Sequence, residues 1–397
     1  MTDDGINKKE FIERATGPIE SCEELSEEMI WSKHGTAIWK ADRFVGSPYF
    51  YTVYKYHDLY SYSLLNLILH KGTLKLNRRV VQEASKPGFN YYSGMDTIDL
   101  EIERVGGTPK PEFLIKEPSE YARLLAKALR EDISLAEDNH PGFTNIILCG
   151  GKDSQNLLLL PWKNPVLVAS GSPNYELVKL FVADNGLSYD VVELDDKNNS
   201  LLELDILANC CRNNLEHCRY GYHLRELSYK FGNKVIFWNG QWGDAFTTPH
   251  WKTLTHGINY VYKLVPRIGM ILGKWGRERS RYYLLEKTGY AQRYFFNILW
   301  HRGAMWQGAH QSIMRQITNA VVLSAYHGPA IKVVFSEVDL FSAVREDIRP
   351  MIGEYLHGSP VLYPSENPGP PLSEIRKGIS HAEPFIKVLS SMGITIQ

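Results

Sequence analysis

The chain has 397 residues, of which 44% are hydrophobic and 22% are charged, and its formal net charge is -1. This composition is that of an ordinary globular protein, and the length predicts two or three domains. The near-zero charge gives no overall attraction to nucleic acid or to an anionic membrane surface. Residues 1–15 lack the apolar segment of a secretory signal, and no uncharged apolar run reaches the roughly 18 residues of a membrane span. We therefore expect a cytoplasmic protein that does not contact a membrane.

Strand patterns dominate the chain before residue 118. Short aromatic and β-branched runs, as at residues 49–56 and 97–105, alternate with turn signals that contain glycine and proline. We expect a small strand-rich α+β domain over residues 1–117. The chain has five cysteines without CxxC spacing, an odd number that favours reduced thiols over a disulfide framework or a zinc ribbon.

At residue 118 the pattern changes to helical spacing, which Ser119 is placed to cap, and strands and helices then alternate. Strands are predicted at residues 144–149, 165–170, 188–194 and 234–238. Helices are predicted at about residues 153–160, 173–185, 201–216 and 222–231. This alternation predicts an α/β fold in which a parallel sheet has helices on both faces and binds its ligand beyond the carboxyl ends of the strands. Beyond residue 249 the pattern is mostly helical, with its longest stretch over residues 281–326.

The sequence LCGGKDS at residues 148–154 ends the first of these strands with two glycines, a lysine and an aspartate. A bare strand-to-helix turn is one explanation, because two glycines suit such a turn. The other is an anion cradle, since a loop without side chains lets backbone N–H groups approach a phosphate. The spacing is neither that of a Walker A loop nor that of a dinucleotide fingerprint, but it has the form SGGxDS of a pyrophosphate loop.

Three segments, in order, resemble the synthetase half of the glutamine-dependent asparagine synthetase family, whose relatives include β-lactam synthetases and lasso-peptide cyclases. Residues 148–154 are similar to LSGGxDS, and residues 169–194 are similar to the family segment that follows. Residues 224–246 end in NGQWGDAF, which is similar to a second motif, SGxGxDE. The likeness is good over residues 118–250 and holds only in outline elsewhere. It implies an ATP-binding domain of the adenine nucleotide alpha hydrolase-like fold over residues 118–397.

The resemblance implies a role for each loop. Gly150, Gly151 and Ser154 would hold the β- and γ-phosphates of ATP, and Asp153 and Asp244 would bind Mg²⁺. Two carboxylates from separate loops suit this hard ion, which prefers oxygen ligands. The other residues that the resemblance places around the nucleotide are Leu148, Cys149, Lys152, Val168, Ser170 and Gly240.

In this family a carboxylate attacks the α-phosphorus of ATP, pyrophosphate leaves, and an amine displaces AMP from the acyl-adenylate to form an amide. The resemblance implies that Lys377 stabilises the developing negative charge. A solvated lysine in the proline-rich tail is an equal alternative for this residue. Residues 331–341 resemble the family segment Pro-Phe-Leu-Asp, with Phe335 and Glu337 at matching positions, and there we expect packing or orientation.

The second motif departs from the family pattern. Asn239, Trp242 and Ala245 replace a serine, a glycine and an acidic residue. Gln241 stands where asparagine synthetases carry a glutamate that is thought to help proton transfer. An amide cannot act as a base near neutral pH, so either the nucleophile differs or the amidation step is lost.

The amino-terminal region resembles a shortened, degenerate glutaminase domain in its position and its strands. Active glutaminases carry their nucleophilic cysteine directly after the initiator methionine, where this chain has Thr2, and Cys22 lies too far from the terminus. We therefore expect no glutaminase activity, with ammonia or a substrate amine as the nitrogen source.

The function that these patterns favour is an ATP-dependent, AMP-forming ligase that joins a small-molecule or peptide carboxylate to an amine. Two alternatives stay open: a degenerate synthetase homologue that acts as a binding or scaffolding protein, and a pyrophosphate-loop enzyme that modifies tRNA. Around Cys210, Cys211 and Cys218 we favour buried thiols over a metal site, and at residues 274–283 a solvated helix face over an RNA contact. A homodimer is left open.

Overall fold

The structure of the chain is a computed structural model. It describes the residues in the ranges 38–40, 53–61, 64–79, 97–105, 112–194, 220–249, 314, 318, 320–365, 386 and 389–397. Some sequence predictions fall outside these ranges: those on Thr2, Cys22, residues 201–216, Cys210, Cys211, Cys218, residues 274–283 and Lys377.

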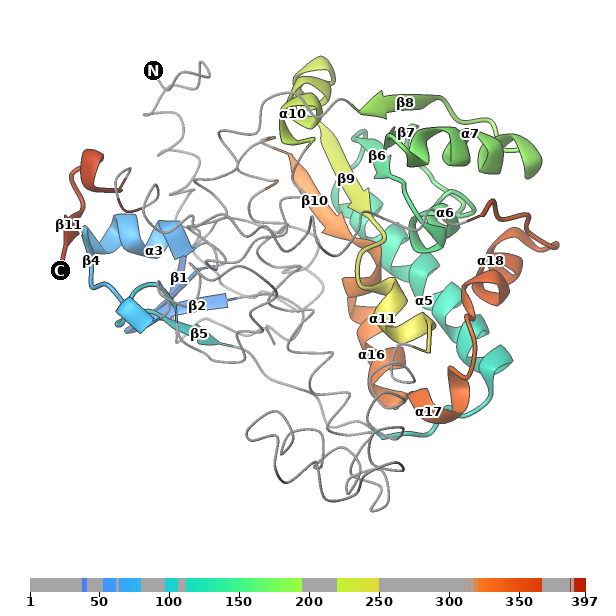
Figure 1. Cartoon of the computed structure of the whole chain (residues 1–397), viewed down its shortest axis with the longest axis horizontal. Helices are drawn as coiled ribbons and strands as arrows, with labels where there is room; N and C mark the ends of the chain where they lie inside the picture. The colour runs from blue at the N-terminus through green and yellow to red at the C-terminus, as the bar shows by residue number, and fades with distance from the viewer. Residues whose placement is uncertain are drawn as a thin grey trace, which may run out of the picture.

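The larger part of the described chain is built on one parallel sheet. Its five described strands are β6 (Thr144–Leu148), β7 (Val166–Gly171), β8 (Val191–Leu194), β9 (Val235–Asn239) and β10 (Val321–Ser324). They lie in the order β10-β9-β6-β7-β8, and each neighbouring pair is parallel (Figure 1). The predicted α/β class with a parallel sheet is therefore confirmed.

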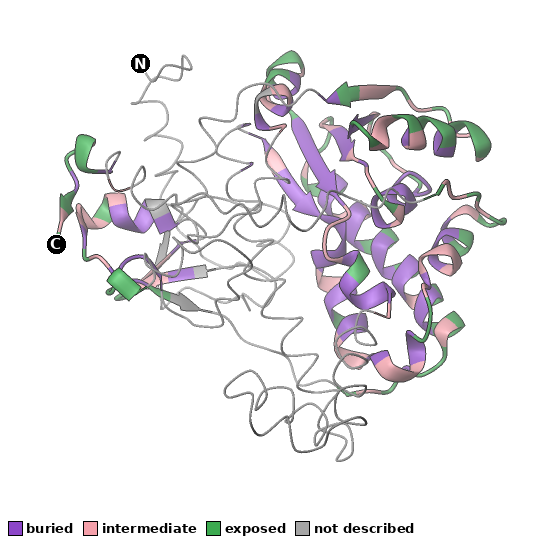
Figure 2. Cartoon of the chain, in the orientation of Figure 1, coloured by how far each residue is buried: buried purple, intermediate pink, exposed green. Residues whose placement is uncertain are grey.

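Helices cover both faces of this sheet. The described helices of this part are α5 (Pro118–Asn139), α6 (Lys152–Leu157), α7 (Asn174–Asp184), α10 (Gly221–Lys230), α11 (Gly243–Thr247), α16 (Pro329–Glu337), α17 (Leu340–Ala343) and α18 (Arg349–His357), of which α16, α17 and α18 pack on α5. The interior strand β9 is buried along its whole length (Figure 2). Its side chains alternate between the two faces of the sheet. Ile236 and Trp238 pack in the hydrophobic cluster that contains α5, whereas Val235 and Phe237 pack in the cluster that contains α10.

The strand order creates a reversal point in the middle of the sheet. From β6 the chain moves outward through β7 to β8, and it then returns to the other side of β6 to form β9 and β10. In open sheets of this kind the loops that follow the two strands at the reversal diverge, and ligands bind between them. Here the two strands are β6 and β9, so the segments after Leu148 and Asn239 flank the expected ligand position.

The long helical prediction over residues 281–326 is wrong at its carboxyl end. Residues Val321–Ser324 form strand β10, in which Val322 and Leu323 pair with Phe237 and Trp238 of β9. Helical periodicity cannot show such a pairing, because a short apolar run looks alike in a buried strand and in a buried helix. A smaller correction concerns α5, whose N-cap is Glu117 with Pro118 as the first helical residue, so Ser119 is not the cap.

Two buried acidic side chains join α5 to the rest of the domain. The carboxylate of Asp132 accepts the backbone N–H groups of Ala330 (2.9 Å) and Ile331 (2.9 Å) at the start of α16. The carboxylate of Glu137 accepts the side-chain amide of Asn145 at 2.8 Å, and Asn145 in turn accepts the indole N–H of Trp238 at 2.8 Å. Each bond replaces one to water that burial removes, so these groups fix the position of α5 against the sheet.

The amino-terminal part contains a separate small sheet. Strands β1 (Ile38–Lys40), β3 (Leu59–Ser61), β2 (Val53–Tyr56) and β5 (Glu103–Val105) are antiparallel in this order, beside helix α3 (Leu64–Lys71). Strand β4 (Thr73–Leu74) pairs in parallel with β11 (Thr395–Ile396), so the last residues of the chain join this part. The domain boundary between residues 117 and 118 stays a prediction.

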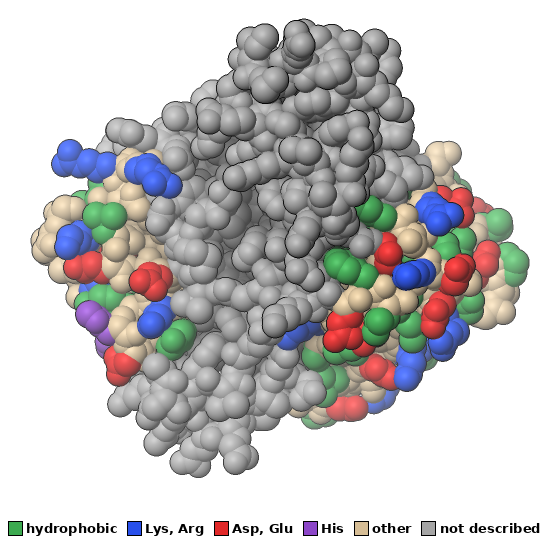
Figure 3. Space-filling view, turned by 90° about the horizontal axis from the view of Figure 1, so that it is seen from below, with side chains coloured by type: hydrophobic (Ala, Val, Ile, Leu, Met, Phe, Trp, Pro, Cys, Tyr) green, Lys and Arg blue, Asp and Glu red, His purple; other side chains and the backbone are tan. Residues whose placement is uncertain are grey.

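The described surface is mixed in character. On the face seen in Figure 3, acidic, basic and hydrophobic side chains of the described residues are interspersed. None of the helices in the described ranges is long and apolar enough to cross a membrane.

Candidate functional site

The loops that follow β6 and β9 lie directly against each other. Leu148 and Asn239, the last residues of the two strands, are paired in the sheet. A Cβ atom on Gly240 would lie 2.5 Å from the backbone nitrogen of Ser154 and 2.8 Å from the carbonyl carbon of Asp153. Real Cβ atoms do not come this close to a backbone, so the approach of the second loop to the first requires glycine at position 240.

The glycine loop is held closed by its own serine. The hydroxyl of Ser154 accepts the backbone N–H of Gly150 at 2.8 Å and donates to the carbonyl of Gly151 at 2.9 Å. A Cβ atom on Gly151 would meet no described atom within 4 Å, so the outer side of the loop is open. In this structure Ser154 thus orders the loop, while Gly151 leaves its backbone accessible.

Cys149, which stands where the resemblance expects a serine, is a buried free thiol. Burial raises the pKa of this thiol to about 12, although a hydrogen bond with Ser154 opposes the shift. The thiol therefore stays protonated at neutral pH, and we assign it a packing role instead of a nucleophilic one.

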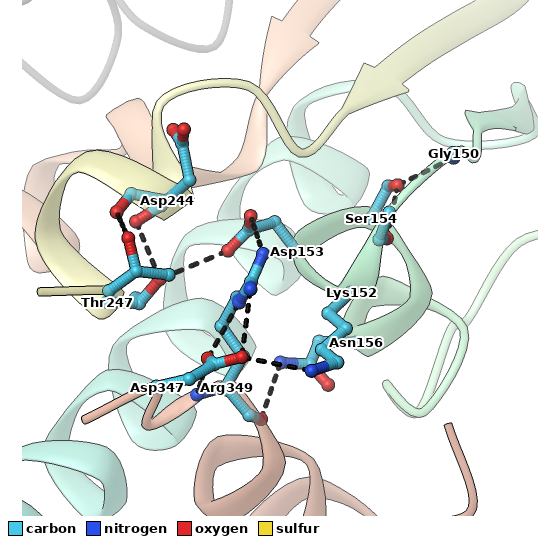
Figure 4. A network of polar contacts seen from close by, with 12 residues as sticks. Gly150, Lys152, Asp153, Ser154, Asn156, Asp244, Thr247, Asp347 and Arg349 are labelled. Carbon is cyan, nitrogen blue, oxygen red and sulfur yellow. Dashed lines mark hydrogen bonds and ion pairs between the residues drawn. The ribbon is translucent and has the colours of Figure 1, made fainter. Parts of the chain in front are cut away.

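Asp153 lies between the two loops with both carboxylate oxygens engaged (Figure 4). One oxygen accepts the hydroxyl of Thr247 at 3.2 Å, and the other lies 3.3 Å from Nη1 of Arg349. A Cβ atom on Gly243 would lie 2.5 Å from the carboxylate. Burial raises the pKa of Asp153 to about 7; the Arg349 guanidinium lowers it, and the nearby Asp244 carboxylate raises it further.

Arg349 is fixed by a second acidic residue. Its Nε and Nη2 each donate to a separate oxygen of Asp347 at 2.8 Å, which makes a bidentate pair. Asp347 also accepts the ammonium group of Lys152, the lysine of the glycine loop, at 3.0 Å. Burial alone would raise the pKa of Asp347, but hydrogen bonds from Arg349 and Lys152 hold it below its ordinary value. Two cations and two carboxylates thus form one cluster under the glycine loop (Figure 4).

Asp244 occupies a different position from Asp153. It lies in the first turn of α11 and is exposed. Figure 4 shows its carboxylate pointing away from the ion pair of Asp153 and Arg349. The two predicted metal ligands therefore stand on adjoining loops and interact electrostatically, one buried and one exposed.

This donor set fits a magnesium ion that is held partly by phosphates. Mg²⁺ is commonly bound through one or two carboxylates, with substrate phosphates and water as its other ligands. Within the described ranges no group of three or more His, Cys, Asp or Glu side chains gathers around one point. Each oxygen of Asp153 already has one protein partner, so a metal there would share the carboxylate with Thr247 and with the positively charged Arg349.

The second loop keeps a turn that glycine would normally make. Trp242 has a left-handed backbone, with φ of 75°, at the position where the resemblance expects a glycine. The backbone N–H of Gln241 donates to the side chain of Asn239 at 3.2 Å, and its carbonyl accepts Ser324 of β10 at 2.9 Å. These contacts from two strands hold the turn in place of the missing glycine.

Three buried polar atoms of the same loop have no hydrogen-bond partner among the described residues. They are Nδ2 of Asn239, Oε1 of Gln241 and Nε1 of Trp242. Buried polar groups are nearly always satisfied, by protein, water or a ligand. The loop after β9 thus contains two donors and one acceptor that a buried water or a ligand would satisfy.

The end of β7, where the resemblance places adenine, is closed by a tyrosine. Val168 and Ser170 are buried, and the Ser170 hydroxyl has no hydrogen-bond partner in the described part of the chain. A Cβ atom on Gly171 would lie 1.9 Å from the hydroxyl oxygen of Tyr220, so glycine is needed for this ring to cross the strand end. Tyr220 is a residue of this edge that the sequence did not suggest.

Neither models of known protein families nor curated proteins match this chain. The likeness to the asparagine synthetase family therefore rests on the three motifs alone. The geometry independently brings the first and third motifs into contact at the carboxyl edge of the sheet, around Asp153 and Gly240. The segment with Phe335 and Glu337 lies in α16, where Phe335 stacks on Phe246 at 4.0 Å, as expected for a packing role.

Three residues of this cluster were not predicted from the sequence: Thr247 and Arg349, which contact the Asp153 carboxylate, and Asp347, which holds Arg349. One local signal was available in the sequence EDIRP. An arginine that begins a helix is unfavourable beside the positive end of the helix dipole unless an acid compensates it. Asp347 does so, since it also accepts the backbone N–H of Arg349 at 3.1 Å. The contact with Asp153 had no local signal.

Proposed function

We propose that this protein is an ATP-dependent, AMP-forming ligase of the asparagine synthetase type, which activates a carboxylate and joins it to an amine. The observation that supports it most is the contact of the glycine loop with the loop after β9, at the reversal point of a parallel sheet. An adenine nucleotide alpha hydrolase-like fold would bind ATP at this place. The three motifs and the two carboxylates agree with that placement.

In this proposal the glycine loop binds the phosphates of ATP. Gly151 leaves the outer side of the loop open, and the Ser154 hydroxyl holds the loop in a closed shape before the nucleotide arrives. A preformed loop binds an anion without an ordering cost at the moment of binding. Magnesium bound at Asp153 and Asp244 would neutralise the charge of the departing pyrophosphate.

The chemical step that follows is balanced by two bond exchanges. An oxygen of the substrate carboxylate bonds to the α-phosphorus as the bond to the pyrophosphate oxygen breaks. The amine nitrogen then bonds to the acyl carbon while AMP leaves with the electron pair of the broken C–O bond. Gln241 cannot accept the proton that the amine loses, so the nucleophile arrives neutral or brings its own base.

The test of this function is isothermal calorimetry followed by exchange of labelled pyrophosphate into ATP. We expect ATP and pyrophosphate to bind in the presence of Mg²⁺, and Asp153→Ala to weaken the metal-dependent part of the binding most. Exchange that depends on an added carboxylic acid would identify the acid. If the native protein binds none of ATP, AMP and pyrophosphate, the proposed ligase activity is contradicted.

A binding or scaffolding role is the second candidate. It is favoured by the pairing of Asp153 with Arg349, which already neutralises this carboxylate without a metal, and by the absence at Gln241 of the glutamate that the family carries. The same calorimetry separates the two, because a scaffold has no need to bind metal-nucleotide at this edge. A protein that binds Mg²⁺-ATP but never exchanges pyrophosphate with any acid would favour this second role.

A further inference from the structure

The cluster under the glycine loop contains one guanidinium whose three nitrogens are all directed at carboxylates. Nε and Nη2 of Arg349 hold the two oxygens of Asp347, and Nη1 lies 3.3 Å from an oxygen of Asp153. The side chain of Arg349 is 11% exposed and that of Asp153 is 12% exposed. The guanidinium is therefore fixed on one side by Asp347 and presents only Nη1 to the glycine loop.

Asp347 also restrains Lys152, the lysine of the glycine loop. One of its oxygens accepts both Nη2 of Arg349 and the ammonium group of Lys152. The helix that Arg349 begins is tied to the glycine-loop helix by further bonds, because Asn156 donates to the Arg349 carbonyl at 3.0 Å and Tyr363 bonds to Asn156. This arrangement keeps two positive groups beside the loop with little freedom to move away.

A metal ion and a guanidinium compete for the same carboxylate. A Mg²⁺ ion bound to this carboxylate would neutralise the charge that attracts Nη1 and would repel the guanidinium, which lies 3.3 Å from one of the carboxylate oxygens. Such a metal would therefore weaken the attraction of Asp153 for Nη1, while Asp347 would still hold Nε and Nη2 in place. Phosphates bound at such a metal would then have Nη1 of Arg349 available as a fixed, largely buried donor, and guanidinium groups are well suited to binding phosphate oxygens.

We propose that Arg349 is the internal counter-ion of Asp153 in the nucleotide-free protein and becomes a pyrophosphate-binding residue when a divalent metal replaces it, with Asp347 as its positioning residue. This inference rests on the proposed function, since it names a further binding group of the same site. The geometry of the three side chains carries it. In this proposal, α18, which lies outside all three sequence motifs, contributes to the recognition of the β- and γ-phosphates.

The experiment compares the native protein with Arg349→Gln, Arg349→Lys and Asp347→Asn by calorimetry with ATP, pyrophosphate and AMP, each with Mg²⁺. Arg349→Gln should lower the affinity for ATP and pyrophosphate by about 10- to 100-fold, the loss expected for one hydrogen bond to a charged group. AMP lacks the β- and γ-phosphates, so its affinity should change by less than about 2-fold and report that the variant is folded. The affinity of Arg349→Lys for ATP and pyrophosphate should lie between those of the native protein and Arg349→Gln, because lysine keeps the positive charge but lacks the planar, multidentate guanidinium group.

A metal measurement separates an exchange of partners from general damage to the site. Mn²⁺ alone, followed by its paramagnetic resonance signal, should bind Arg349→Gln about 5-fold or more tightly than the native protein, because the competing cation is gone. A damaged site would bind both metal and pyrophosphate more weakly. Opposite changes in the two affinities are therefore the signature of the proposal.

Two controls complete the design. Arg130 of α5 donates to the carbonyls of Tyr355 (2.6 Å) and Leu356 (3.1 Å) at the far end of α18, so Arg130→Gln removes an arginine that contacts α18 away from the glycine loop. It should leave the pyrophosphate and Mn²⁺ affinities within about 2-fold. Asp347→Asn should weaken pyrophosphate binding in the native background and have a smaller effect in Arg349→Gln, where only its contact with Lys152 remains to be lost.

The outcomes distinguish the inference from the function on which it rests. A native protein that binds ATP and pyrophosphate, with Arg349→Gln binding them equally well, overturns the inference and leaves the ligase proposal intact. A parallel loss of pyrophosphate and Mn²⁺ affinity in Arg349→Gln overturns it too. A native protein that binds no nucleotide and no pyrophosphate overturns both.

Discussion

Single residues decide how closely the two loops of the site approach each other. Gly240 passes over the backbone of Asp153 and Ser154, and Gly243 passes over the Asp153 carboxylate. Neither needs a left-handed backbone; both lack a side chain because another part of the chain fills the space where a Cβ atom would be. Close packing of this kind leaves no room for even one methyl group.

Gly240→Ala should therefore open the contact between the loops. The added methyl would lie 2.5 Å from the Ser154 nitrogen, so the backbone has to shift, at a cost of about 1–3 kcal/mol in the free energy of unfolding. Thermal or urea denaturation measures this loss. Gly151→Ala makes the same chemical change where a Cβ meets no described atom within 4 Å, and it should stay within about 0.5 kcal/mol of the native protein. Equal losses of stability in both variants would contradict the close contact between Gly240 and the backbone of the glycine loop.

The buried carboxylate of Asp153 should make the stability of the metal-free protein depend on pH. Its pKa is raised from an ordinary value of 3.8 to about 7, chiefly by burial, so the folded protein holds the proton more tightly than the unfolded chain. The stabilisation from this proton is fully present below the ordinary pKa and is lost as the pH rises through about 7.

Denaturation of the native protein and of Asp153→Asn at pH values from acid to neutral checks this sign. The native protein should lose stability relative to the variant as the pH rises, because the asparagine cannot ionise. Added Mg²⁺ should reduce the loss at neutral pH by binding the ionised carboxylate. A native protein that instead gains stability relative to Asp153→Asn over this range would show that the charge of Arg349 outweighs burial.

Gln241 stands at the position where the proposed ligase would need a proton acceptor. If the amine must arrive neutral, the rate of amide formation by the native protein should rise with pH. Gln241→Glu should raise that rate near neutral pH by about 10-fold or more, within the range typical of general-base catalysis. Pyrophosphate exchange, which needs no amine, should change little and serves as the control. Fast amidation by the native protein, unaltered by the substitution, would mean that another residue is the base.

Helices α5 and α18 support the site, although neither contains one of the sequence motifs. Helix α18 supplies Arg349 and contacts both α5 and α6, and α5 positions α16 through Asp132. A Cβ atom on Gly328 would lie 2.1 Å from the Asp132 carboxylate, so the start of α16 is built around this acid. Local propensity would place an acidic residue in the first turn of α16 itself, whereas this helix takes its acid from another helix.

Asp132→Asn should destabilise the α/β part by about 2–3 kcal/mol, because an amide has only one oxygen to accept the two N–H groups of Ala330 and Ile331. Denaturation curves would measure the loss. Glu131→Gln is a matched control: it removes one negative charge from the neighbouring position of α5, where the side chain is exposed and only a surface ion pair with Lys127 at 3.5 Å is lost. It should change stability by less than about 0.5 kcal/mol. Similar losses of stability in both variants would show that the negative charge on α5 matters, and not the hydrogen bonds between Asp132 and the start of α16.

At the scale of the whole molecule, the described core residues fall into separate clusters. The clusters on the two faces of the large sheet share strands β6, β7, β9 and β10. A third cluster joins the amino-terminal part to the last residues of the chain, through Leu67, Leu74, Leu389 and Ile394. Strand β11 completes it, since the backbone N–H of Leu76 donates to the carbonyl of Gln397 at 2.9 Å.

Ile394→Ala should loosen the amino-terminal part and leave the large sheet intact. The Ile394 side chain is buried in the third cluster, and its truncation should cost about 2–4 kcal/mol locally. Hydrogen exchange followed by mass spectrometry should show faster exchange in peptides that cover β4 and β11, while peptides of β6 and β9 exchange as before. Equal acceleration in β9 would mean that the two parts unfold as one unit.

Much of the fold and part of the site follow from local sequence patterns. The apolar runs that form β6, β7 and β9 are bounded by glycines and polar residues, so their positions and the parallel sheet were predictable within one or two residues. The glycine loop and Asp153 were predictable for the same reason, because a strand that ends in two glycines and an aspartate is a local feature. Strand β10 was predicted as helix, since its four residues carry no signal that separates the two structures.

The partners of Asp153 could not be predicted, because they come from distant parts of the chain. Arg349 is 196 positions away and Thr247 is 94 positions away, and only the folded sheet brings all three side chains together. Neither residue type nor spacing indicates which of many exposed or buried arginines meets a given carboxylate. Local patterns set which segments become strands, helices and tight loops, since these depend on a few neighbouring residues. The electrostatic surroundings of the site depend on the packing of α18 against α5 and α6, which brings together segments that lie far apart in the sequence.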